Sequence, residues 1–109
     1  MSGVGPREPG TDKIPGLKLD PLGEILSYDF EAQCHSVFKN VRNILEDAGS
    51  NWKNLVDVTV FLTNMRKDFT VYNRLYAESF RENQPCRTTV EVTRLPTDIA
   101  IELKCIATI

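Results

Sequence analysis

The sequence predicts a fold of the α+β or α/β class, with helices packed on one face of a β-sheet. Two segments, residues 29–49 and 67–82, repeat apolar residues at helical spacing. Three others, residues 56–63, 87–95 and 99–109, have the alternation or β-branched content of strands. The order of these elements is helix, strand, helix, strand, strand, which favours helices gathered on one side of a sheet.

The first predicted helix has one apolar stripe and recognisable ends. Asp29 is the expected N-cap, Glu31 suits the positive helix start, and Gly49 is the expected residue after the last turn. Cys34 lies on the stripe and is expected in the core, since free cysteine is usually buried. His35 lies off the stripe and is expected in solvent. The stripe consists of Cys34, Val37, Phe38, Val41, Ile44, Leu45 and Ala48.

The next two segments differ in their period. Residues 56–63 alternate, with a more polar second face, so they predict a strand. Its apolar positions are Val56, Val58, Val60 and Leu62. Residues 67–82 return to helical spacing, and their stripe is largely aromatic. Such a stripe more often packs in a core or an interface than around a cofactor. It consists of Phe69, Tyr72, Tyr76 and Phe80, with Leu75 beside it.

The length of 109 residues predicts a single domain over residues 1–109. Residues 1–23 are loop-rich, because they hold five of the six glycines and four of the six prolines. Residues 24–109 hold the helices and strands. Within the first part, "LKLD" at residues 17–20 is read either as a short edge strand or as a surface loop.

Composition excludes several classes of function. A net charge of −2 does not favour a nucleic-acid surface, which needs a basic face. No apolar run approaches the ~20 residues of a membrane helix, and the start lacks signal-peptide features. Three cysteines, none at C-x-x-C spacing, and one histidine do not predict a structural metal site. We expect a reduced, soluble, cytoplasmic protein without metal.

The candidates for chemistry are polar residues on predicted strands and helices, since no phosphate-binding or nucleophile motif occurs. Arg87 opens the strand in "PCRTTVEV", and its guanidinium suits either a surface salt bridge or a carboxylate ligand. Glu102, in the last strand, faces solvent, an interface or a cleft. Asn73 lies between two tyrosines of the second helix, where a plain surface amide is the simpler interpretation. Thr89 suits a strand.

Three blocks of the sequence resemble one known family. They are "EAQ…VFKNVRNILEDAGS", "VDVTVFLTNMRKDFTVYNRLYAESF" and "PCRTTVEVTRLPTDIAIELKCIAT". The last is similar to the signature P-x-R-x-x-V-x-V-x-x-L-P followed by I-E-x-x-x-I-A. The chain therefore resembles the Rid, or YjgF, family of enamine and imine deaminases over nearly its whole length. The form "SGVGPREPGT" resembles the 2-aminomuconate deaminase branch most.

The resemblance implies a chorismate-mutase-like α+β fold, with a mixed sheet and two helices on one face. It also implies a homotrimer with ligand clefts between subunits. Arg87 matches the arginine that grips a substrate carboxylate, Glu102 the glutamate that holds the attacking water, and Asn73 an asparagine of the cleft. Thr89 matches a position where many members have cysteine, so it is expected to contact substrate without a thiol. Members usually carry further strands and a cleft aromatic before "SG", so we expect an unpaired sheet edge here.

The function that the resemblance implies is hydrolysis of small carboxylate-bearing enamines or imines, such as 2-aminomuconate or 2-aminoacrylate, with release of ammonia. Arg87 and Glu102 are the expected catalytic residues, and Arg87, Asn73 and Thr89 the expected substrate-binding residues. No cofactor is expected, because the substrate already carries the reactive C=N bond. The alternative is a non-catalytic trimer that binds small carboxylates or acts like a chaperone. An RNA-directed activity, which is ascribed to some relatives, is not favoured, because the sequence predicts no basic face that would bind RNA.

Overall fold

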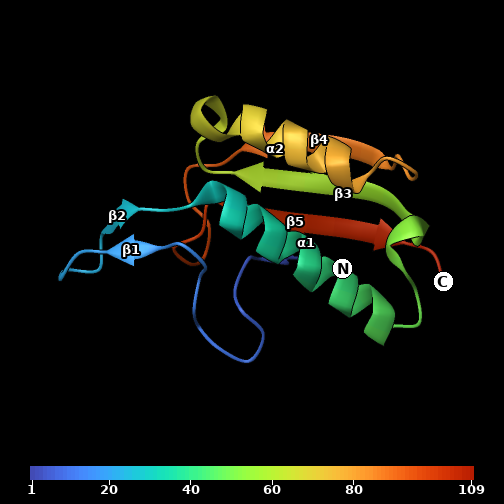
Figure 1. The fold of residues 1–109 in the computed structure, drawn as a ribbon, viewed down its shortest axis with the longest axis horizontal. Helices are drawn as coiled ribbons and strands as arrows, with labels where there is room; N and C mark the ends of the chain where they lie inside the picture. The colour runs from blue at the N-terminus through green and yellow to red at the C-terminus, as the bar shows by residue number, and fades with distance from the viewer.

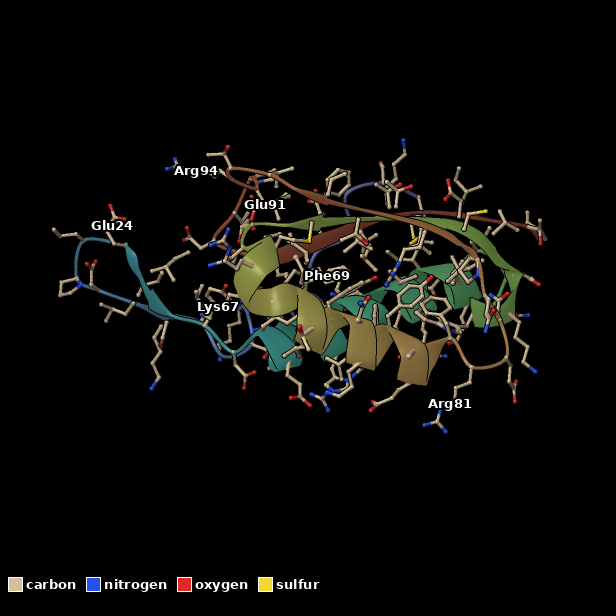
Figure 2. The ribbon with its side chains drawn as sticks, turned by 90° about the horizontal axis from the view of Figure 1, so that it is seen from above. Glu24, Lys67, Phe69, Arg81, Glu91 and Arg94 are labelled. Atoms are coloured by element: carbon tan, nitrogen blue, oxygen red, sulfur yellow. The ribbon has the colours of Figure 1, made fainter.

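The chain folds into one layer of helices on one layer of sheet. The computed structural model describes all of residues 1–109 (Figure 1). Helices α1 (Phe30–Asp47) and α2 (Met65–Ser79) lie on the same side of strands β3 (Leu55–Leu62), β4 (Cys86–Glu91) and β5 (Ile101–Ala107) (Figure 2). The strand order is β4-β3-β5, with β3 parallel to β4 and antiparallel to β5. The predicted α+β fold, with a mixed sheet and two helices on one face, is confirmed.

Helix α1 has the predicted ends. The Asp29 carboxylate accepts a hydrogen bond from the Ala32 N–H, as an N-cap does. Gly49 follows the last turn at φ 82°, a conformation that glycine adopts without strain. The buried face of α1 packs on the sheet and on α2. The buried residues are Phe30, Gln33, Cys34, Val37, Phe38, Val41 and Leu45.

The predicted stripe of α1 is wrong at its C-terminal end. Ile44 and Ala48 are exposed, whereas Phe30 and Gln33 at the other end are buried. Gln33 accepts a hydrogen bond from the Ala100 N–H through Oε1 at 2.8 Å, which ties the first turns of α1 to the start of β5. In the last turns Ile44 faces an open pocket beside the N-terminal segment instead of the sheet.

Strand β3 contains an irregularity that moves its first buried residue. The alternation predicts Val56 in the core, yet Val56 is 45% exposed and Leu55 is buried. The register of β3 against β5 shifts between Leu55 and Asp57, where β3 has one extra residue. This β-bulge places Leu55, and not Val56, on the side of the sheet that faces the helices. From Val58 onward, the predicted alternation holds.

The last two strands are shorter than predicted and do not pair with each other. The segment predicted over residues 87–95 ends at Glu91, and the segment predicted over 99–109 begins at Ile101. Both residues pair with Leu62, the last residue of β3, so the outer strands end where the central strand ends. The residues of β5 that face the helices are Ile101, Leu103 and Cys105.

The N-terminal segment lies along the outer edge of β5. Val4 and Leu103 exchange two backbone hydrogen bonds of 2.9 Å, and the Cys105 N–H donates to the Met1 carbonyl at 2.9 Å. Val4 is buried in the core. Residues 1–4 therefore pair with the outer edge of β5 at Leu103 and Cys105, so the unpaired edge that was expected is not found at these two residues.

A hairpin projects from the body beside the start of α1 (Figures 1 and 2). The predicted short strand is β1 (Lys18–Leu19), and it pairs with β2 (Ile25–Ser27), which the sequence did not reveal. The Asp20 carboxylate holds the turn by accepting hydrogen bonds from two backbone N–H groups. Leu22, at the turn, is 88% exposed, so the hairpin adds nothing to the core.

Helix α2 lies over β4 and brings the predicted aromatic stripe against the core. Tyr72 and Leu75 are fully buried, and Phe69 and Tyr76 are partly buried. Phe80, at the helix end, stacks on Tyr76 with the ring centroids 4.3 Å apart. The predicted role of the stripe in core packing is confirmed. Neither this helix nor α1 is long and apolar enough to cross a membrane.

We expect Gly16→Ala to lower the free energy of unfolding by roughly 2–4 kcal/mol, from backbone strain and steric overlap together. Gly16 has φ +70° at the hairpin base, and an added Cβ would lie 2.4 Å from the Cβ of Asp29. Gly10→Ala is the matched control, since Gly10 has φ +73° with nothing within 4 Å of such a Cβ, and it should cost about 1 kcal/mol. Urea unfolding measures both, and equal losses would contradict the steric argument.

Candidate functional site

Arg87 is held in place by helix α2. Its Nη1 donates a hydrogen bond to Asn73 Oδ1 at 2.7 Å, and its guanidinium carbon lies 4.7 Å from the centre of the Tyr76 ring. It takes part in none of the four ion pairs of the chain, so the salt-bridge interpretation is not what the structure shows. Arg87 is therefore an exposed cation that Asn73 and Tyr76 hold in position, and its remaining N–H groups are free to donate to a ligand.

The pocket around Arg87 has a volume of about 760 Å³ between the end of α2 and the start of β4. Asn73, Tyr76 and Arg87 line it together with Arg81. A guanidinium fork, an amide and an aromatic wall suit a planar anion such as a carboxylate. We call this cavity the arginine pocket; its lining is Asn73, Tyr76, Ala77, Phe80, Arg81, Gln84, Pro85 and Arg87.

Thr89 lies on the same face of β4 as Arg87, beneath α2, because the two residues are two positions apart on a strand. Its hydroxyl is buried and has no hydrogen-bond partner, and the same holds for the hydroxyls of Tyr72 and Tyr76. Burial raises the pKa of both tyrosines, so they stay protonated. Sequence reasoning missed these tyrosines; the available signal was two hydroxylated aromatics four residues apart, next to Asn73.

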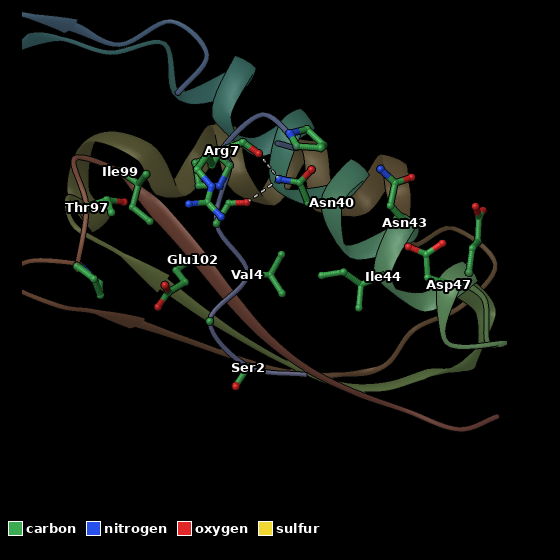
Figure 3. Close-up of a pocket in the computed structure, with 16 residues that line it drawn as sticks. Ser2, Val4, Arg7, Asn40, Asn43, Ile44, Asp47, Thr97, Ile99 and Glu102 are labelled. Atoms are coloured by element: carbon green, nitrogen blue, oxygen red, sulfur yellow. Dashed lines mark hydrogen bonds between the residues drawn. The ribbon is translucent and has the colours of Figure 1, made fainter. Parts of the chain in front are cut away.

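Glu102 lies in a different cavity, on the other side of the central strand. It lines a pocket of about 790 Å³ together with residues 2–7 and the outer side of α1 (Figure 3). Gly3 adjoins it, since a Cβ on Gly3 would lie 3.8 Å from Glu102 Oε1. Asn40 holds the N-terminal segment over this pocket by donating to the carbonyls of Gly5 and Arg7 at 2.9 and 2.7 Å.

One chain does not bring Arg87 and Glu102 together. Arg87 pairs with Val58 on the helix-facing side of the sheet, whereas Glu102 pairs with Phe61 on the opposite side. The two residues are two strands apart and three residues apart along the strands, so their Cα atoms are about 14 Å apart. Arg87, Asn73 and Thr89 thus lie on the helix side of the sheet, and Glu102 is separated from all three on the opposite face.

The face of the sheet away from the helices has no covering layer. Phe61, at its centre, is partly exposed, and Val90 and Ile106 are 37% and 52% exposed. Large apolar side chains on an uncovered sheet face are typical of protein–protein contacts. Glu102 lies on this face, so a second chain packed there would approach it.

The cysteines do not contribute a nucleophile to the arginine pocket. Burial raises the pKa of Cys34 to about 12 and that of Cys105 to about 11, which keeps both thiols protonated. Cys34 lies in the core, as predicted, and Cys86 is exposed. Nowhere do three His, Cys, Asp or Glu side chains gather to hold a metal ion.

Comparison with known proteins places the chain in a family. Residues 6–109 match the family described as Endoribonuclease L-PSP. A RutC family protein of Pyrococcus abyssi is 42% identical over 92 residues, which cover 84% of this chain and 72% of that protein. The chain belongs to the YjgF/Rid family.

Other members connect the family to deamination and to this fold. Reactive Intermediate Deaminase A of Arabidopsis thaliana is 36% identical over 91 residues, covering 84% of this chain and 48% of that protein. The crystal structure of the Escherichia coli YjgF gene product superposes with a TM-score of 0.80 at 34% identity, over 98% of this chain and 76% of that one. The Escherichia coli protein TdcF, solved with bound serine, gives 0.81 at 32% identity, over 98% and 76%.

We expect only Cys86 to react with iodoacetamide in the folded protein at pH 8, because the other two thiols are buried and their pKa values lie well above that pH. Intact-mass spectrometry should show one adduct on the native chain and three after unfolding in urea. A second adduct on the native chain would mean that Cys34 or Cys105 is accessible, and would reopen a role for a thiol.

Proposed function

We propose that this YjgF/Rid protein is a hydrolytic deaminase of small enamines and imines that carry a carboxylate. The observation that supports it most is Arg87, an exposed arginine anchored by Asn73 in a pocket and left without an ionic partner. A bidentate guanidinium–carboxylate pair is among the strongest polar contacts that a protein can offer a small ligand. Relatives named reactive intermediate deaminase support this reaction class.

The complete site, in this proposal, is formed between subunits of a homotrimer. Arg87, Asn73 and Thr89 of one subunit bind the substrate, and Glu102 of a neighbour supplies the carboxylate. This arrangement accounts for two features: the separation of Arg87 and Glu102 within one chain, and the uncovered sheet face that carries Glu102. Apolar residues such as Ile106 would be buried when that face packs on a neighbour.

The proposed reaction requires orientation and proton transfer only. Arg87 docks the substrate carboxylate, which fixes the C=N carbon close to a water molecule on Glu102. The Glu102 carboxylate takes a proton from this water as its oxygen bonds to carbon, and the C=N electron pair moves to nitrogen. Protonated Glu102 passes that proton to the nitrogen, which completes the carbinolamine. The carbinolamine hydroxyl then gives its proton, through Glu102, to the same nitrogen as the C=O bond forms and the C–N bond breaks, so ammonia leaves a carbonyl product. An enamine substrate first moves an N–H proton to carbon and becomes the imine. No cofactor takes part, because the substrate already holds the electrophilic carbon.

Two substrates fit this site in different ways. 2-Aminoacrylate has one carboxylate, which Arg87 alone can bind. 2-Aminomuconate has two, and Arg81, the second cation that lines the arginine pocket, offers a place for the other. TdcF, which was solved with bound serine, shows that a YjgF/Rid relative holds a small amino acid. We propose 2-aminomuconate as the preferred substrate on the strength of the second arginine.

Replacing Arg87 with alanine should lower kcat/KM about 10²-fold for either substrate, since a charge-assisted bidentate pair is lost. Ammonia release from freshly generated 2-aminomuconate and 2-aminoacrylate measures this loss. Arg81→Ala is the matched control: it removes a cation from the same pocket but leaves the Arg87–Asn73 hydrogen bond. It should impair 2-aminomuconate and spare 2-aminoacrylate. Unchanged kinetics in Arg87→Ala would remove this residue from the site.

The location of the site between subunits can be tested by mixing two inactive variants. Arg87→Ala and Glu102→Gln are unfolded together, refolded as a mixture and assayed. If each site takes Arg87 from one subunit and Glu102 from the next, random assembly should restore about a quarter of the sites. If both residues act within one subunit, no mixed trimer contains an intact site and activity stays absent. Turnover retained in Glu102→Gln would remove Glu102 from the reaction, whereas carboxylate binding with no turnover in wild type or in Glu102→Gln would support the non-catalytic, carboxylate-binding alternative.

A further inference from the structure

A series of three stacked aromatic rings connects Trp52 to Arg87. The Trp52 and Phe80 rings stack with their centroids 4.6 Å apart and an interplanar angle of 27°. Phe80 stacks in turn on Tyr76, at 4.3 Å and 29°. The guanidinium carbon of Arg87 lies 4.7 Å from the centre of the Tyr76 ring, and that of Arg42, on α1, lies 4.1 Å from the centre of the Trp52 ring. A cation therefore lies at each end of the series.

The middle ring of this series cannot move independently of the others. Phe80 is only 4% exposed. Phe38, from α1, packs edge-on against both Trp52 and Phe80, with centroid distances of 5.7 and 6.3 Å. Protein interiors are close-packed, so a displaced ring displaces its neighbour. The position of the Trp52 ring is therefore transmitted through Phe80 to Tyr76.

Trp52 also fixes the end of α2 through hydrogen bonds. Its Nε1–H donates to the carbonyl of Ser79, the last residue of the helix, at 2.9 Å. A carbonyl in the last turn of a helix has no partner within the helix, so this bond satisfies one that would otherwise be free. The Trp52 carbonyl accepts a hydrogen bond from Asn83 Nδ2 at 3.1 Å, which ties down the segment after the helix. Residues 80–85 of this segment include four that line the arginine pocket.

We propose that Trp52 is a positioning residue of the arginine pocket: through Phe80 it fixes the Tyr76 ring, and with it the place of the Arg87 guanidinium. Trp52 is not among the residues that line the pocket, so it acts through these neighbours and not by touching a ligand. As a statement about substrate binding, this inference rests on the proposed function.

The chain offers a closely matched residue at the other end of α2. Tyr28, like Trp52, is a partly buried aromatic residue packed against the core. The Nζ of Lys67 lies 4.2 Å from the centre of its ring, and its hydroxyl donates to Asp68 Oδ2 at 2.6 Å. Asp68 is in the first turn of α2. Tyr28 and Trp52 therefore hold opposite ends of one helix, and only Trp52 stacks on a ring that lines the pocket.

The test compares Trp52→Leu with Tyr28→Leu by NMR of the ligand-free protein and by kinetics. In wild type, the Tyr76 ring should shift the δ protons of Arg87 upfield, because the guanidinium lies over that ring. Trp52→Leu should return these protons toward their value in the unfolded chain, whereas Tyr28→Leu should leave them unchanged. Trp52→Phe keeps an aromatic ring on Phe80 and should restore most of the shift. If Trp52→Leu does not fold, Trp52→Met takes its place.

The same variants should differ in KM for 2-aminoacrylate, measured by ammonia release. Trp52→Leu should raise KM about 10-fold and change kcat about 2-fold or less, because the pocket holds the substrate alike in the ground state and the transition state. Tyr28→Leu should lose comparable thermal stability and keep the KM of wild type. This contrast separates positioning from a general loss of stability.

Three results would overturn the inference. The first is an Arg87 shift that is absent in wild type or unchanged in Trp52→Leu. The second is an equal change in Trp52→Leu and Tyr28→Leu, which would mean that any loosening of α2 disturbs the pocket. The third is a displaced Arg87 with an unchanged KM, which would contradict the role in substrate binding.

The NMR comparison also separates this inference from the proposed function. The Arg87 shift is measured without substrate, so it tests the positioning whether or not the protein turns over. If wild type releases no ammonia from either substrate but Trp52→Leu alone displaces Arg87, the deaminase proposal is wrong and the positioning stands. If wild type is active and the shift is the same in all variants, the deaminase proposal stands and the positioning is wrong.

Discussion

The parallel pairing of β4 with β3 is the constraint on which the candidate site depends. Two parallel neighbours need a connection that crosses over the sheet, and α2 is that connection. The register sets Arg87 opposite Val58, on the side where α2 lies, so a charged strand residue meets the polar and aromatic side chains of the helix. The hydrogen bond from Arg87 to Asn73 and the ring of Tyr76 beneath the guanidinium both follow from this register. A shift of one residue would turn Arg87 to the uncovered face.

The side chains under α2 form both a packed core and one side of the arginine pocket. Most of the core is aliphatic or aromatic and well satisfied, and Trp52, for instance, donates its indole N–H to the Ser79 carbonyl at 2.9 Å. The exceptions are four buried polar atoms without a partner: Gln33 Nε2 in α1, and the hydroxyls of Tyr72, Tyr76 and Thr89 under α2. The arginine pocket, in contrast, holds an exposed Arg87 guanidinium that has no ionic partner. Ligand binding explains such a pocket better than core packing does.

The division of polar residues between two faces has a further consequence. The helix-facing side of the sheet offers cations and donors at Arg87, and the uncovered side offers a carboxylate at Glu102. The proposed reaction needs both, and the geometry of a single chain keeps their Cα atoms about 14 Å apart. Assembly would join the two halves, so the proposed activity and the proposed trimer depend on each other.

The sequence by itself determined the class of fold, the main elements and the family, because hydrophobic periodicity and local motifs act over a few residues. The N-cap at Asp29 and the alternation of β3 beyond Val58 are of this kind. Tertiary structure alone decided which strands are neighbours, that residues 1–4 run along β5, and that Ile44 is exposed. It also decided that Arg87 lies against Asn73 and Tyr76, and that Glu102 lies on the other face. These are contacts between residues distant in sequence, or choices between two faces, and local patterns do not encode them.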